Sequence, residues 1–135
     1  MKRLFVDTAG WMACADASDA KHKDCCASRD EWIADGGLLV TTDYVVDESL
    51  TLIKVRMGLV AAEAWWRQCE ASSRLRFEWI DALRAERALS RFFRSRDKGF
   101  SFTDCTSFVV MEELRIRHAL TVDRHFEQMG FTALP

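Results

Sequence analysis

Short apolar runs alternate with amphipathic stretches along the whole chain, and this alternation is what most constrains the fold. Leu4–Val6 and Leu38–Val40 are apolar runs too short for helices, and polar residues or glycines bound them, which is typical of buried strands. Helical periodicity fills the segments between such runs. Strands that alternate with helices predict an α/β fold with a mainly parallel sheet covered on both faces. A chain of 135 residues has room for one domain, and we expect a single domain over residues 1–135.

The periodicity predicts five strands and seven helices. The strands are expected at 4–6, 38–40, 76–80, 119–122 and 131–133. The helices are expected near 11–15, 19–35, 59–72, 81–95, 101–117 and 123–128, and a long third helix is expected to start near 41–43. Ser18 or Asp19 is expected to start the second helix, and Gly99 to break the basic stretch that ends the fifth. In the third helix, Thr41, Thr42 and Asp43 are N-cap candidates, and its apolar rhythm is Val46, Leu50, Ile53, Met57 and Val60.

Composition and charge exclude several classes of protein. The net charge of −2 does not suggest a bulk electrostatic grip on nucleic acid. No apolar run approaches the roughly 18–20 residues that span a bilayer, and an acid follows only three apolar residues at the N-terminus, unlike a signal peptide. Five cysteines, an odd number without CxxC spacing, argue against a disulfide framework or zinc site. We therefore expect a cytoplasmic protein without a membrane segment.

Four carboxylates fall where the chemistry of a parallel sheet collects, at the carboxyl ends of strands. Asp7 ends the first strand and Asp123 follows the fourth directly. Asp104 lies in the first turn of a helix, and Glu48 in the second turn of the helix after the second strand. These four side chains are therefore candidates for one site at one edge of the sheet.

Each of the three aspartates also has a purely structural interpretation. Asp7 suits a turn after a strand. Asp104 completes the capping pattern Ser101-x-x-Asp104, in which the acid also favours the helix dipole. Asp123 suits the N-cap of the last helix. From the residues alone, both interpretations stay open at all three positions.

Glu48 is the most informative of the four because its neighbour Asp47 serves as an internal control. Asp47 falls on a helical row that is polar throughout, with Asp43, Thr51 and Lys54. Glu48 falls on the row of Val45, Leu52 and Val55, which is otherwise apolar. An ionised carboxylate on a core-facing row is costly unless a cation or hydrogen bonds compensate it. The pattern favours Glu48 over Asp47 as the site residue, the alternative being a Glu at the margin of the apolar face that reaches solvent.

Clustered carboxylates repel one another, and a divalent cation that prefers oxygen ligands relieves the repulsion. Mg²⁺ or Mn²⁺ would suit, because each keeps several waters and bridges to substrate phosphates. Such a site can generate hydroxide and stabilise a phosphodiester transition state.

Four segments that contain these acids resemble the PIN-domain ribonucleases, specifically the toxins of VapBC-type toxin–antitoxin pairs. The segments span nearly the whole chain in the order of that family: Leu4–Thr8, Thr42–Leu52, Ser101–Phe108 and Leu120–Phe126. The resemblance implies a PIN-like three-layer α/β/α sandwich and a metal-dependent endoribonuclease, usually a homodimer, inhibited by a small cognate antitoxin.

The resemblance also implies roles for particular residues. By position, Asp7, Glu48, Asp104 and Asp123 would be the catalytic and metal-binding quartet around Mg²⁺ or Mn²⁺. Thr8 and Thr106 occupy places where the family often has a hydroxyl and are supporting candidates. Either Glu48 or Asp104 would help to position the attacking water.

Basic residues beside these motifs are candidate RNA contacts, and the role of His125 is left open. Four basic residues lie just before or after the acidic motifs: Arg94, Arg96, Lys98 and Arg124. They could contact the RNA backbone, or they could belong to a solvated surface. His125 adjoins Asp123 and could touch a phosphate, but its spacing from His22 and His118 is not that of metal ligands.

Three alternatives to an RNA-cleaving toxin are considered. A PIN-fold nuclease acting on structured DNA would need added DNA-binding elements that the chain lacks. A receiver-type signalling domain would need an acidic pair after the first strand and a lysine after a later one, and neither is present. A non-catalytic or housekeeping PIN-fold module for RNA processing or protein interaction is distinguished only by assay.

Overall fold

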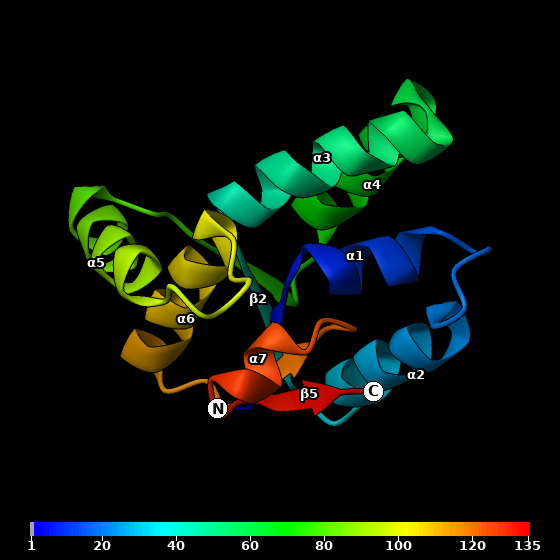
Figure 1. The fold of residues 1–135 in the computed structure, drawn as a ribbon. Helices are drawn as coiled ribbons and strands as arrows, with labels where there is room; N and C mark the ends of the chain where they lie inside the picture. The colour runs from blue at the N-terminus through cyan, green and yellow to red at the C-terminus, as the bar shows by residue number, and fades with distance from the viewer. Residues whose placement is uncertain (1) are drawn as a thin grey trace.

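A five-stranded sheet forms the centre of the molecule in the computed structural model, which describes residues 2–135 (Figure 1). The strands lie in the order β3-β2-β1-β4-β5, and every neighbouring pair is parallel. Their bounds are β1 Arg3–Val6, β2 Leu38–Thr42, β3 Leu75–Glu78, β4 His118–Leu120 and β5 Thr132–Leu134. The predicted α/β class with a parallel sheet is confirmed.

Seven helices cover the two faces of this sheet. They are α1 Thr8–Ala15, α2 His22–Ala34, α3 Asp43–Met57, α4 Leu59–Ala71, α5 Ala82–Arg94, α6 Phe102–Leu114 and α7 His125–Gln128. Figure 1 shows α5 and α6 on one side and α1 and α2 on the other, with α3 and α4 together along the top. This division follows from right-handed crossovers, because the chain moves in one direction from β1 to β3 and in the opposite direction from β4 to β5.

The change of direction creates a crevice between β1 and β4. The chain leaves β1 for β2 on one side and reaches β4 on the other side only after α6, so the two strands pair across a topological switch point. Val6 of β1 lies opposite Leu120 of β4. The residues that follow these two strands therefore emerge side by side at the carboxyl edge, where ligands bind in open parallel sheets.

The sheet owes its stability to burial on both faces. Residues 4–6 of β1 and residues 119–120 of β4 are fully buried. Beneath α6 and α7, Phe108 and Phe126 lie edge to face with ring centroids 5.1 Å apart. Packing of this kind stabilises a domain of this size without disulfides.

Two predicted helix limits are wrong by about three residues, each for a local reason. The second helix begins at His22 rather than at Ser18 or Asp19, because the Asp16 carboxylate accepts hydrogen bonds from the Ser18 amide and hydroxyl and holds a turn there. The fifth ends at Arg94, inside the basic stretch and one residue before the predicted limit, so Gly99 is not what ends it. The sixth ends at Leu114 because Arg115 adopts a left-handed conformation with φ of 56°.

The third helix begins as predicted and ends earlier than its apolar rhythm indicates. Thr42 is the N-cap, and its hydroxyl accepts a hydrogen bond from the Val45 amide. Gly58, with φ of 97°, ends α3 and starts α4. Val60 is 86% exposed in α4, so its place in the apolar rhythm of the third helix is wrong. The remaining elements match within a few residues; α1 begins at Thr8 rather than near Trp11.

Candidate active site

Asp7 lies directly beyond β1, at the N-cap of α1. Its Oδ1 accepts a hydrogen bond from the Gly10 amide at 2.8 Å, and its Oδ2 accepts one from the Thr121 hydroxyl at 2.8 Å. Only 5% of the residue is exposed. Gly10 is required here, because a Cβ at this position would stand 2.1 Å from the Leu120 carbonyl oxygen. The close approach of α1 to β4 thus fixes the Asp7 carboxylate beside the residues that follow β4.

Asp104 combines a capping role with a place at the same edge of the sheet. The Ser101 hydroxyl accepts a hydrogen bond from the Asp104 amide, and the Asp104 carboxylate accepts one from the Ser101 amide. These two bonds complete the predicted capping box. The side chain is only 14% exposed, and its Oδ2 also lies 2.9 Å from Nδ1 of His125. The capping interpretation and the site interpretation therefore both apply to this residue.

Asp123 follows β4 in a tight turn that Thr121 organises. The Thr121 hydroxyl accepts the Asp123 amide and donates to Asp7, so one side chain connects the two strand ends. The Asp123 carboxylate in turn accepts a hydrogen bond from the His125 amide at 2.9 Å. The N-cap of α7 is Arg124 rather than Asp123, so the simple capping interpretation of Asp123 is displaced by one residue.

His125 joins the two aspartates. Its Nδ1 lies 2.9 Å from Asp104 Oδ2 and 3.1 Å from Asp123 Oδ2, and ligand atoms of the three residues lie within 4.8 Å of one another. The spacing of the histidines along the chain did not predict this cluster, which forms because α7 folds back toward the start of α6. The available signal was the position of His125 two residues after an Asp that follows a strand.

Glu48 reaches the same edge from α3, and the contrast with Asp47 is as predicted. Glu48 is partly buried and Asp47 is exposed. The reasoning behind the prediction holds only in part, since Val45 is buried but Val55 is 75% exposed. The row of Glu48 faces the protein at its start and leaves it two turns later, because α3 projects beyond the sheet.

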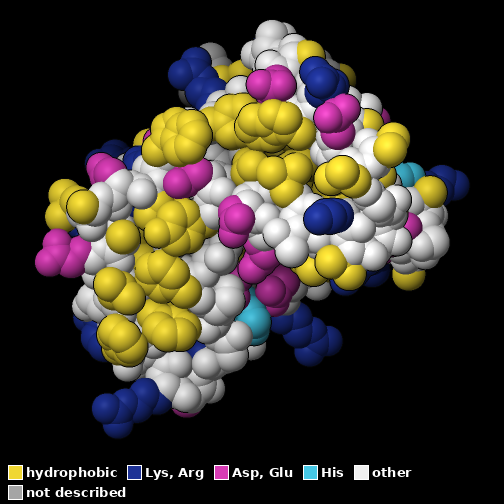
Figure 2. All heavy atoms as spheres, turned by 90° about the horizontal axis from the view of Figure 1, so that it is seen from above, with side chains coloured by type: hydrophobic (Ala, Val, Ile, Leu, Met, Phe, Trp, Pro, Cys, Tyr) yellow, Lys and Arg dark blue, Asp and Glu magenta, His cyan; other side chains and the backbone are white. Residues whose placement is uncertain are grey.

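The four predicted acids line one pocket of about 380 Å³ at the carboxyl edge of the sheet. Figure 2 shows acidic side chains gathered there beside a histidine. Of the supporting hydroxyls, Thr8 lines the pocket and Thr106 does not, because its hydroxyl donates to the Thr103 carbonyl within α6. Ser107, the next residue, lines it instead. His125, which the sequence already placed beside Asp123, also lines it, as do two charged residues that we did not predict, Asp19 and Arg56.

The predicted RNA contacts lie outside the pocket lining. All four side chains are exposed: Arg94, Arg96, Lys98 and Arg124. Lys98 precedes Gly99, which lines the pocket, and Arg124 lies between Asp123 and His125, which also line it. Contact with RNA by these residues stays a prediction.

The electrostatics of the pocket favour a positive charge within it. The pKa of Asp7 is raised from 3.8 to about 7, mainly by burial and in smaller part by the charges of Asp123 and Asp104, against the opposing effect of its hydrogen bonds. Burial also raises the pKa of Asp104, and the charge of Asp123 adds to this. Both shifts record the cost of confining negative charges away from water.

A divalent cation fits the residues present. The donors are carboxylate oxygens, which Mg²⁺ and Mn²⁺ prefer. Two buried hydroxyls of the lining, on Thr8 and Ser107, have no hydrogen-bond partner within residues 2–135, so further oxygens are available to water or an ion. A cation would compensate both the burial and the smaller charge repulsion that raise the pKa of Asp7.

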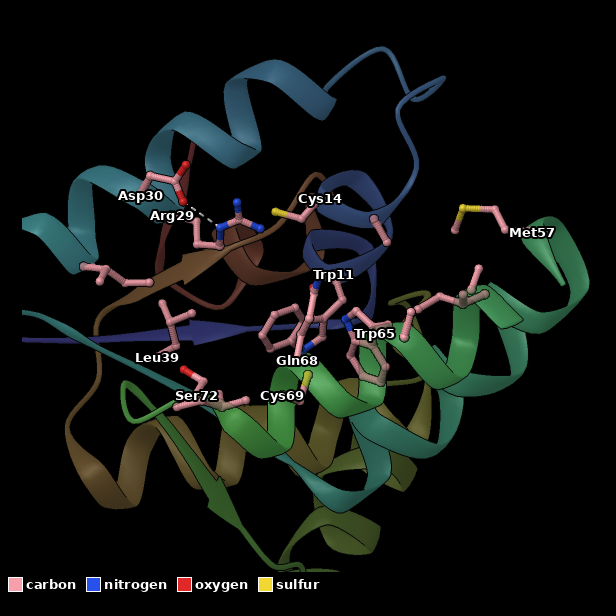
Figure 3. A pocket seen from close by; sticks show the side chains of 16 residues that line it. Trp11, Cys14, Arg29, Asp30, Leu39, Met57, Trp65, Gln68, Cys69 and Ser72 are labelled. Carbon is pink, nitrogen blue, oxygen red and sulfur yellow. Dashed lines mark hydrogen bonds and ion pairs between the residues drawn. The ribbon is translucent and has the colours of Figure 1, made fainter. Parts of the chain in front are cut away.

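A larger cavity of about 610 Å³ lies elsewhere, between α1, α2 and α4 (Figure 3). Its wall is mostly apolar, with Trp11, Ile33 and Trp65 among the lining residues. Its charged residues, Arg29 and Asp30, pair with each other. Burial raises the pKa of its two thiols, Cys14 and Cys69, to about 12, so both stay protonated and are poor nucleophiles. The larger cavity therefore offers no reactive group, and the candidate active site is the smaller, acidic pocket.

The parallel sheet, its helical layers and the acidic pocket at its switch point define a PIN-like α/β/α protein. No protein-family profile matches the chain. It is 33% identical over 128 residues, 95% of each chain, to the 23S rRNA-specific endonuclease VapC20 of Mycobacterium tuberculosis. It is 30% identical over 120 residues to a VapC ribonuclease of Archaeoglobus fulgidus, covering 84% of this chain and 72% of that protein.

The structural comparison agrees with the sequence relatives. The crystal structure of M. tuberculosis VapC20, described as a sarcin-ricin loop cleaving toxin, superimposes with a TM-score of 0.87 at 32% identity, over 98% of this chain and 99% of that one. The chain belongs to the VapC family of PIN-domain ribonucleases. Within residues 2–135, no helix is long and apolar enough to cross a membrane.

Proposed function

We propose that this chain is a Mg²⁺- or Mn²⁺-dependent endoribonuclease that acts in the cytoplasm as the toxin of a toxin–antitoxin pair. The observation that carries the proposal is the convergence of Asp7, Glu48, Asp104 and Asp123, from four separate segments, on one pocket at the switch point of the sheet. Membership in the VapC family supports the same function.

In this proposal the four carboxylates hold the cation. When bound, the cation supplies Lewis-acid stabilisation of the phosphodiester transition state and lowers the pKa of bound water. Thr121 fixes the carboxylate of Asp7, and the capping box fixes that of Asp104. His125 holds Asp104 and Asp123 together through its Nδ1.

We assign the positioning of the attacking water to Glu48. The three aspartates each accept hydrogen bonds from backbone or side-chain donors, which orient them. Glu48 accepts none from residues 2–135, so its carboxylate oxygens remain available to a water molecule. Of the two residues left open by the sequence for this role, Glu48 is therefore favoured over Asp104.

The substrate proposed is RNA of the large ribosomal subunit. The M. tuberculosis relative is named for 23S rRNA, and its structure for the sarcin-ricin loop. The high similarity in length and fold makes a loop of this RNA the first substrate to test. A small cognate antitoxin as inhibitor and assembly as a homodimer are part of the same proposal.

The proposal is tested with purified protein and an RNA hairpin that carries the 23S loop. We expect cleavage in Mn²⁺ or Mg²⁺ and none in excess chelator, because the site offers oxygen ligands to a hard cation. Undiminished cleavage in chelator, by protein free of contaminating nuclease, contradicts the metal mechanism.

Expression in cells tests the toxin function separately. The protein expressed alone should arrest growth, and co-expression of its small partner should restore it. Harmless expression of a soluble protein that cuts RNA in the purified assay favours a housekeeping nuclease. A protein that neither arrests growth nor cuts RNA favours a non-catalytic module.

A further inference from the structure

One face of α3 connects the acidic pocket with a cation. Glu48, Leu52 and Arg56 follow one another at four-residue steps, which places them on the same face of a helix. All three line the pocket. Glu48 and Arg56 are separated by about 12 Å along the helix axis, so Arg56 lies at the rim when Glu48 lies within.

Arg56 carries a positive charge in a pocket lining that is otherwise acidic. Among the lining residues that the structure describes it is the only Lys or Arg, against five acids: Asp7, Asp19, Glu48, Asp104 and Asp123. An RNA strand that approaches the pocket meets repulsion from these acids unless cations compensate it. A bound divalent ion neutralises the interior, whereas the rim has Arg56.

The guanidinium of Arg56 is also available. Within residues 2–135 no carboxylate lies within 4.0 Å of it, whereas Arg84 and Arg91 of α5 pair with Glu113 and Glu112. The charge of Arg56 contributes to the lowered pKa of Asp16, although hydrogen bonds from Ser18 contribute more. Arg56 is exposed, so a ligand can reach it without rearrangement of the fold.

We infer that Arg56 binds a phosphate of the RNA next to the scissile one and so positions the strand across the acidic pocket. The inference rests on the proposed function and adds a substrate-binding residue to it. A guanidinium presents paired N–H donors that match two phosphate oxygens, and its charge does not depend on pH. The contact is made equally in the ground state and the transition state, so it lowers KM and leaves kcat unchanged.

Arg56→Gln tests this role, with Lys54→Gln as a matched control. Lys54 lies on the same helix, is exposed, faces solvent rather than the pocket and carries the same charge. In the RNA hairpin assay, Arg56→Gln should raise KM about tenfold with kcat within threefold, and should reduce the slope of log(kcat/KM) against log[salt] by about one. Lys54→Gln should match the parent in KM, kcat and salt slope. Arg56→Lys should have a KM between those of the parent and Arg56→Gln.

A binding measurement separates this inference from the proposed chemistry. On an Asp7→Asn background in Mn²⁺, fluorescence anisotropy reports the Kd for uncut RNA. Adding Arg56→Gln should raise the Kd about tenfold and adding Lys54→Gln should not. This result supports the inference even if the parent proves unable to cut RNA. Equal effects of the two substitutions, or a fall in kcat at unchanged KM, overturn it.

Discussion

Asp7→Asn and Asp104→Asn are each expected to reduce RNA cleavage by at least ~10³-fold, because each removes a carboxylate that the proposed function assigns to the cation site. Neither substitution should unfold the protein. An Asn at position 7 can still accept the hydrogen bond from the Gly10 amide through its side-chain oxygen, and an Asn at position 104 can still accept the one from the Ser101 amide. The measurement is the initial rate of hairpin cleavage in Mn²⁺ by proteins of confirmed fold.

Asp81→Asn is the control for these two variants. Asp81 is also an acidic N-cap, on α5, where its carboxylate accepts the Arg84 amide, but it lies outside the pocket. Its substitution should leave the rate within a few-fold of the parent. Loss of activity in all three variants would mean that helix capping, and not the shared site, explains the effect. Retention of more than a tenth of the activity by Asp7→Asn would remove that residue from the catalytic set.

The second large effect is expected at adjacent acids of α3. Glu48→Gln should cost at least ~10²-fold in rate, since the variant keeps the side-chain shape and loses the negative charge that faces the pocket. Asp47→Asn should remain within a few-fold of the parent, because Asp47 is exposed on the solvent face of the helix. The two rates are compared in the same assay. A more damaging effect at Asp47 would mean that α3 is rotated relative to the structure.

The acids were predictable from the sequence because their positions follow from simple rules. A charge directly after a buried apolar run, as at Asp7, lies at a strand end, and parallel strand ends share one edge. The capping pattern at Ser101 located the start of a helix, and the helix start located Asp104. For Glu48 the helical row indicated the acid that lines the pocket, although Val55 on the same row is exposed.

The other members of the pocket depend on tertiary contacts that local patterns do not encode. His125 meets Asp104 only because α7 packs beside the start of α6, 21 residues earlier in the chain. Thr106 and Ser107 differ by one step around α6, about 100° of rotation, which a boundary uncertain by a residue or two does not resolve. Arg56 reaches the pocket because α3 extends past the sheet, and its periodicity alone resembles that of any amphipathic helix.

The central claim, that these acids form one cation site, predicts a pattern in stability. The pKa of Asp7 is 3.8 in an unfolded chain and about 7 in the folded protein. The folded state therefore holds its proton up to higher pH, and stability falls as pH rises through this window. Above pH 7 the buried charge costs at most about 4 kcal/mol, since one pKa unit corresponds to about 1.4 kcal/mol. A cation bound to the folded site offsets this cost by mass action.

Thermal melting of the parent, Asp7→Asn and Asp47→Asn at pH 8, in chelator and in Mn²⁺, tests this claim most directly and needs no substrate. In chelator, Asp7→Asn should be more stable than the parent by about 1–2 kcal/mol, a gain that disappears below pH 4. It should also gain less than the parent from added Mn²⁺. Asp47→Asn should follow the parent under both conditions. If all three proteins melt together with and without Mn²⁺, the four acids do not form one cation site.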